Sequence, residues 1–194
     1  MTNHFNGTAE SKNIDIKKQN LLSSKRIKVI LMIVYSIAII YFMFFGFDRP
    51  QISNTLQEYR FSIVPTGIPL WLPKNLSFVT LELWIFSLGN LLAFVPFGVL
   101  IPMIFGTKYF KFIYIFLISI LSLEIFQMIT YLGSFDVEDI IINALGATIG
   151  FSSYKIGNRS KIVSKKIIVI IFLVLIFSFL LIAFAEIFNK MFAV

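Results

Sequence analysis

Carboxylate and amide side chains recur inside the long apolar stretches of this sequence, where charged residues are rare. Glu124 is the only charged residue between Phe112 and Leu132. A carboxylate at that depth in a membrane-spanning helix costs several kcal/mol, so it must face protein or trapped water rather than lipid. Such groups bind polar ligands, transfer protons or hold hard cations. Glu124 therefore indicates a polar interior and a candidate site.

Other polar residues share helical faces with this carboxylate or with a second acidic group. Gln127 lies three residues after Glu124, so the two side chains are neighbours on one helical surface. At about 100° per residue, Asp136, Asp139 and Asn143 form a single stripe on the following helix. Asp136 can instead cap that helix by accepting from backbone N–H groups. For Asp139 we favour a pocket, because its carboxylate shares a face with Asn143.

The polar residues of three helices are expected to meet at one depth in the membrane. Asn90, Glu124 and Asn143 each lie about seven or eight residues from the same end of the bundle, or roughly 10 to 12 Å at 1.5 Å per residue. Reversing the orientation moves all three together. We therefore predict one pocket, with Glu124 and Asp139 as the catalytic candidates if the site is enzymatic and with these ligand-binding candidates: Asn90, Glu124, Gln127, Asp136, Asp139 and Asn143.

The elements that position these residues are apolar stretches of membrane-spanning length. Crossing the hydrocarbon core takes roughly 20 apolar residues, and hydrophobic residues make up 58% of the chain. The sequence predicts an all-α integral membrane protein, a bundle of five transmembrane helices, at about 29–47, 83–104, 112–132, 136–154 and 167–187. This domain (29–188) follows a polar, basic tail (1–28) that we expect to be disordered. It includes an outer loop (48–82) and precedes a C-terminal end (189–194).

Basic residues gather in alternate connections, which predicts the orientation of the bundle. Most of the 17 Lys and Arg residues precede the first helix, or lie between the second and third or the fourth and fifth. By the positive-inside rule the N-terminus is cytoplasmic and the C-terminus lies outside. Such clusters contact lipid head groups, so we expect the bilayer as partner, no nucleic acid, and an oligomeric state left open. The absence of cysteine excludes disulfides and thiolate chemistry.

Prolines and glycines in the second and fourth helices predict a bend and a close helix contact. Pro96 and Pro102 each remove a backbone donor and free a carbonyl one turn earlier, which is typical of a kink. Gly146 and Gly150 have the small-xxx-small spacing that lets two helices approach closely. We assign Gly98 to the same packing role.

Three segments that carry these residues resemble the signature blocks of the VanZ-like membrane proteins. They are LGNLLAFVPFGVLIP (Leu88 to Pro102), SLEIFQ (Ser122 to Gln127) and FDVEDIIINALGATIGF (Phe135 to Phe151), in that order. Many relatives carry an arginine just before the acidic block, where this chain has Gly133 and Ser134. The resemblance implies a multi-pass protein of the bacterial cell membrane that lowers sensitivity to teicoplanin and related glycopeptide antibiotics. The matching positions are Asn90, Pro96, Gly98, Glu124, Gln127, Asp136, Asp139, Asn143, Gly146 and Gly150.

A pocket near the outer face suits recognition of a lipidated or lipid-linked molecule, and we favour a binding protein over an enzyme. An intramembrane enzyme acting on a lipid-linked cell-wall precursor remains an alternative. It would use Glu124 as acid or base, or Mg²⁺ or Ca²⁺ held by oxygen ligands; we assign no metal site. The single histidine, His4, lies in the polar tail, which excludes Ser-His catalysis. A proton-coupled transporter component, or polar residues that only join helices, are further alternatives.

Overall fold

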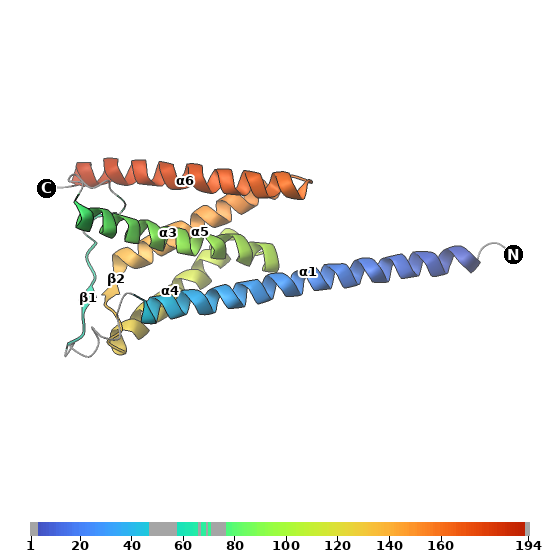
Figure 1. Cartoon of the computed structure of the whole chain (residues 1–194), viewed down its shortest axis with the longest axis horizontal. Helices are drawn as coiled ribbons and strands as arrows, with labels where there is room; N and C mark the ends of the chain where they lie inside the picture. The colour runs from blue at the N-terminus through green and yellow to red at the C-terminus, as the bar shows by residue number, and fades with distance from the viewer. Residues whose placement is uncertain (1–3, 47–57, 66, 69, 71–76, 193–194) are drawn as a thin grey trace.

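Five helices and two very short strands form the part of the chain that the computed structural model describes, namely residues 4–46, 58–65, 67–68, 70 and 77–192 (Figure 1). Strands β1 (Phe61–Ser62) and β2 (Phe135–Asp136) pair in parallel. The helical bundle expected from the sequence is confirmed, and this strand pair is an addition to it. The helices are α1 (His4–Phe45), α3 (Phe78–Phe105), α4 (Tyr109–Ile129), α5 (Val137–Gly157) and α6 (Val163–Phe192).

The helices have the length and composition of a multi-pass membrane protein. Four described segments are long and apolar enough to cross a bilayer: Leu22–Phe45 within α1, all of α3 and α4, and Val163–Met191 within α6. Their outward faces carry large apolar side chains, such as Ile168 and Phe172 on α6, that are well exposed in the isolated chain. Those side chains would be unfavourable in water, and lipid is the solvent that suits them.

Short connections and local caps set the order of the central helices. The αL residue Gly106 (φ 63°) ends α3, and its N–H donates to the Pro102 carbonyl at 2.9 Å. Because only two residues separate Gly106 from the start of α4, the chain reverses direction between α3 and α4, whose side chains meet in one apolar cluster. At the start of α5, the Asp136 carboxylate accepts from the Glu138 N–H at 2.8 Å. Pro96 and Pro102 both lie within α3, which remains one helix from Phe78 to Phe105.

Helices α3 and α5 form the centre of the bundle and run in the same direction. A Cβ added to Gly146 would lie 2.0 Å from the Leu91 carbonyl oxygen, and one added to Gly150 would lie 2.1 Å from that of Val95. On α3, a Cβ at Gly98 would lie 2.0 Å from the carbonyl oxygen of Ala147. The three glycines therefore let the two backbones come into direct contact.

The N-terminal segment, for which the sequence predicts disorder, is continuous with the first membrane helix in the structure. Helix α1 begins at His4, so residues 4–28 form the first part of one helix of 42 residues. This part extends well beyond the other helices (Figure 1). A helix that is already nucleated in the membrane adds one hydrogen bond for each further residue, and this segment contains no proline to stop it.

The described part of the 48–82 loop is attached to the turn between α4 and α5. The Phe135 N–H donates to the Arg60 carbonyl at 3.0 Å, beside the β1–β2 pair. Tyr59 stacks on Tyr131, with ring centroids 5.0 Å apart. A side-chain hydrogen bond with Tyr59 raises the pKa of the Tyr131 phenol. These contacts hold the loop against the end of the bundle where α4 finishes and α5 begins.

A second set of contacts holds the loop to α6 and α3. Asn189 of α6 donates to the Ile68 carbonyl at 2.8 Å and accepts from the Ile68 N–H at 3.0 Å. Leu70 is fully buried, and its carbonyl accepts from the Trp84 indole at 3.2 Å. Helix α3 starts at Phe78, earlier than the second helix expected from the sequence, and α6 continues through Phe192. The remaining loop positions, 48–57, 66, 69 and 71–76, lie outside the described residues.

Candidate functional site

Glu124 and Gln127 lie on the buried face of α4. Each side chain is only 2% exposed, although most of this helix is apolar. The buried residues of α4 recur every three or four positions, and the two polar side chains extend the same stripe that begins with Phe112, Phe116 and Ile120. A helix stripe of this spacing faces the protein interior. The sequence therefore turns the carboxylate inwards through the periodicity of its apolar neighbours.

The Gln127 amide ties α4 to the end of α1. Its Nε2 donates to the Met43 carbonyl at 2.6 Å. Met43 lies in the last turn of α1, where backbone carbonyls have no partner within their own helix. Close by, Phe44 of α1 packs on Phe126 of α4, with ring centroids 5.6 Å apart. The contact gives Gln127 a partner outside its own helix, which its spacing from Glu124 did not predict.

Asn90 and Asp139 join the two central helices. Nδ2 of Asn90 on α3 donates to Oδ1 of Asp139 on α5 at 3.3 Å. Asp139 lies in the first turn of α5, where the positive end of the helix dipole stabilises an anion. The structure therefore brings together two of the residues that we expected in one pocket. On α3, Asn90 is next to Leu91, and on α5 Asp139 precedes Gly146 by about two turns, so the contact belongs to the same helix pair as the Gly146–Leu91 approach.

Asp136 serves as the cap of α5. Its Oδ1 accepts from the Glu138 N–H, and its backbone pairs with Ser62 in the short sheet. These are the contacts of the helix-cap interpretation that we considered beside the pocket interpretation. A ligand-binding role for this carboxylate stays a prediction.

Asn143 provides an available acceptor in the interior. The side chain is 2% exposed, and its Oδ1 accepts no hydrogen bond from the described residues. A buried acceptor without a donor costs roughly 1–3 kcal/mol, so the position would be stabilised by a water molecule or by a ligand donor. Asn143 follows Asp139 by four residues on α5, on the stripe predicted from the sequence. The convergence of Glu124 with Asn90 and Asn143 stays a prediction.

Two further buried hydroxyls were not singled out from the sequence. Ser153 on α5 is fully buried and Ser178 on α6 is 7% exposed, and neither Oγ has a hydrogen-bond partner among the described residues. Ser153 follows Gly150 by three residues, so the spacing that identified the glycines places it on a neighbouring part of the same face. Serine is common in membrane helices as a packing residue, so a serine at these positions carries no functional signal in the sequence.

The acidic residues of the site do not form a metal cluster. Within the described ranges, no three His, Cys, Asp or Glu side chains come together in a group that could hold a metal ion. The described polar residues around the site are carboxylates, amides and hydroxyls. Their chemistry suits hydrogen bonding to a polar group or the holding of a proton.

Comparison with known proteins places the chain in a family. The sequence profile of the VanZ/LLP1 family matches residues 32–158. Protein VanZ of Enterococcus faecium is 32% identical over 99 residues, which cover 50% of this chain and 61% of that protein. No solved structure shows a significant match. Because the profile covers more than half of the sequence and spans the polar residues of α3, α4 and α5, this multi-pass membrane protein belongs to the VanZ/LLP1 family.

Proposed function

We propose that this protein recognises a lipidated or lipid-linked molecule in the outer leaflet through a polar intramembrane pocket, and that it thereby lowers sensitivity to teicoplanin-type glycopeptide antibiotics. The observation that carries the proposal is the burial of Glu124, at 2% exposure, on the inward stripe of an apolar membrane helix. An intramembrane carboxylate of this kind is a functional candidate because its desolvation is costly.

Other buried polar groups support a role in binding. Gln127 and Asn143 are buried to the same extent as Glu124. The Oδ1 of Asn143 can accept a hydrogen bond from a ligand donor. The Asn90–Asp139 contact orients two further polar groups on the adjacent helix pair. A polar head that enters this interior would meet acceptors already fixed by packing, which reduces the entropy lost on binding.

The proposed pocket belongs to the end of the bundle that carries the described loop. Glu124 lies five residues before the end of α4, and Asn143 lies six residues after the start of α5. We propose that this end faces the outside, by the positive-inside rule. We also propose that α5 crosses the membrane, since its 21 residues span about 30 Å at 1.5 Å per residue.

Single cysteines can test this orientation on a background that has none. Ser134 lies in the turn between α4 and α5, and Ser164 lies at the start of α6; both are exposed. We expect a membrane-impermeant maleimide to label Ser134→Cys in intact cells and Ser164→Cys only after permeabilisation. The opposite pattern would place the polar residues in the inner leaflet half and contradict an outer-leaflet ligand.

The binding proposal can be tested with teicoplanin and with teicoplanin from which the acyl chain has been removed. We expect the purified protein in lipid nanodiscs to bind the intact antibiotic at least tenfold more tightly, because burial of each CH₂ contributes about 0.8 kcal/mol. Nanodiscs of the same lipid without protein correct for partitioning into the bilayer. Equal affinity for the two compounds, or binding no stronger than to empty nanodiscs, would contradict the proposal.

A further inference from the structure

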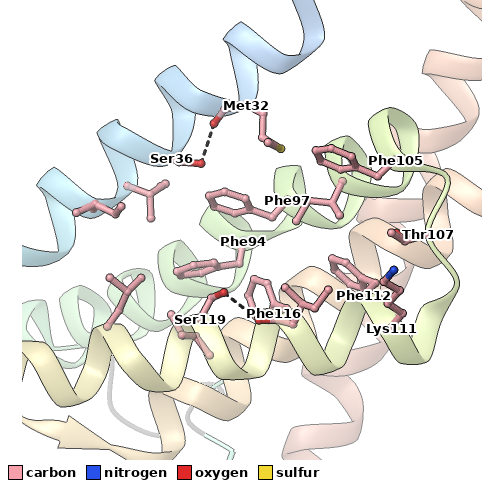
Figure 2. A pocket seen from close by; sticks show the side chains of 16 residues that line it. Met32, Ser36, Phe94, Phe97, Phe105, Thr107, Lys111, Phe112, Phe116 and Ser119 are labelled. Carbon is pink, nitrogen blue, oxygen red and sulfur yellow. Dashed lines mark hydrogen bonds between the residues drawn. The ribbon is translucent and has the colours of Figure 1, made fainter. Parts of the chain in front are cut away.

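We infer that a cavity between α1, α3 and α4 binds one acyl chain of an anionic phospholipid, whose phosphate lies at Lys111 (Figure 2). The cavity has a volume of about 640 Å³, within the range of roughly 300–1,000 Å³ typical of small-molecule sites. It lies apart from the polar residues of the proposed pocket, none of which lines it. This inference does not rest on the proposed function.

The walls of the cavity are suited to hydrocarbon. Rings from two helices, Phe94 and Phe97 of α3 and Phe112 and Phe116 of α4, extend into the space facing α1 (Figure 2). Phe94 and Phe116 meet edge to face, with centroids 5.7 Å apart, so this part of the wall is well packed. An apolar surface of this kind gains free energy when a hydrocarbon chain covers it.

The two serine hydroxyls in the walls have their hydrogen bonds within their own helices. Ser36 donates to the Met32 carbonyl at 2.8 Å, and Ser119 donates to the Ile115 carbonyl at 2.9 Å (Figure 2). Neither hydroxyl therefore requires a polar ligand. The body of the cavity selects an occupant by shape and apolar surface alone.

The length of the cavity matches one leaflet of a bilayer. Its lining on α4 runs from Lys111 to Leu123, which is about 18 Å at 1.5 Å per residue. Half of a hydrocarbon core is about 15 Å thick. Two of the lining residues, Phe105 and Ile115, are 58% and 51% exposed, so the cavity is open to the surroundings of the bundle. A chain of one leaflet can therefore enter sideways between the helices and fill the cavity to its depth.

One end of the cavity carries a positive charge. Lys111 lines it there beside Thr107 (Figure 2), and no Asp or Glu is found among the described residues that form the lining. Lys108, one turn away, precedes the first turn of α4 and leaves that turn without a side-chain cap. Thr107 has a buried Oγ1 with no hydrogen-bond partner in the described part of the chain. Lysine, a hydroxyl and free backbone N–H groups together favour a phosphate.

Retention of phosphatidylglycerol tests the inference. The full-length protein is extracted from nanodiscs of equal phosphatidylglycerol and phosphatidylcholine, and retained lipid is counted by native mass spectrometry. We expect the wild type to retain phosphatidylglycerol preferentially. We expect Lys111→Gln to reduce that retention at least fivefold through loss of the phosphate contact, and Ser119→Phe to reduce it similarly by filling the cavity.

Matched variants separate the cavity from general surface effects. Lys161→Gln removes a lysine charge from the connection between α5 and α6. Ser122→Phe adds a phenyl ring at another exposed serine of α4. Ser122 donates to the Ile118 carbonyl, as Ser119 does to that of Ile115, but it does not line the cavity. We expect both controls to retain phosphatidylglycerol as the wild type does. Equal loss in a control and its partner, unchanged retention in Ser119→Phe, or no preference in the wild type would overturn the inference. None of these results depends on teicoplanin binding.

Discussion

Replacing Gly150 with alanine is expected to destabilise the protein by about 1–3 kcal/mol or more, the usual cost of overpacking a filled interior. The same result is expected for Gly146→Ala. The added Cβ would lie 2.1 Å from the Val95 carbonyl oxygen in the first variant and 2.0 Å from that of Leu91 in the second. Unfolding in mixed micelles with increasing SDS, followed by circular dichroism, measures the loss.

The reason for the large effect is that the obstructing atoms belong to backbone. A crowded side chain can adopt another rotamer, whereas a carbonyl oxygen moves only with its whole helix. To accept the new methyl group, α3 and α5 must separate along their length. That separation weakens the Asn90–Asp139 hydrogen bond of 3.3 Å and opens the apolar cluster that contains Leu91 and Ile142.

Gly89 provides the matched control on α3. A Cβ there would meet nothing within 4 Å, so alanine introduces no clash. We expect Gly89→Ala to be neutral or stabilising by up to about 1 kcal/mol, because alanine is the better helix former. If Gly89→Ala lost as much stability as Gly150→Ala, the loss would not depend on the close approach of the two backbones. The packing explanation would then be contradicted.

The elements of the fold were accessible from the sequence because the membrane leaves few alternatives. A long apolar segment in lipid must satisfy its backbone hydrogen bonds internally, which makes it a helix. Apolar stretches therefore predicted the helical elements of the structure, although not all of their ends. The α4 residues Glu124 and Gln127 could be assigned to an inward face from local spacing, since the stripe is a property of one helix.

Contacts between separate elements could not be read in the same way. The Asn90–Asp139 bond depends on the rotation of two helices about their axes, and no spacing within either helix specifies both. Gln127 binds the backbone of Met43, and Asn189 binds the backbone of Ile68. A backbone carbonyl has no residue type that identifies it in a sequence. Such partners become visible only when the chain is folded.

The cavity at Lys111 shows the same limit for apolar residues. Phenylalanine on a membrane helix suits lipid, a packed interior and a lipid-binding cavity equally well, because all three are apolar. Phe112 is 1% exposed while Phe105 is 58% exposed, yet both line the same space. Hydropathy does not distinguish these environments. The distinction comes from how α1 lies relative to α3 and α4.

Replacing Glu124 with glutamine is expected to weaken teicoplanin binding by roughly 10- to 150-fold, because a hydrogen bond to a charged group contributes about 1.5–3 kcal/mol. Glutamine keeps the size and shape of the side chain, which is 2% exposed, so the packing of α4 is retained. The dissociation constant in nanodiscs and the teicoplanin susceptibility of cells that express equal amounts of each variant are the measurements.

Glu186→Gln supplies the same chemical change where no ligand is proposed. Glu186 forms a surface ion pair with Lys190 at 3.0 Å on α6, and exposed pairs of this kind contribute about 0–1 kcal/mol. We expect this control to bind teicoplanin and protect cells as the wild type does. If Glu124→Gln also did so, the buried carboxylate would have no part in recognition. Its burial would then serve helix association alone, since neutral glutamine can hydrogen-bond across a helix contact as well as the carboxylate does.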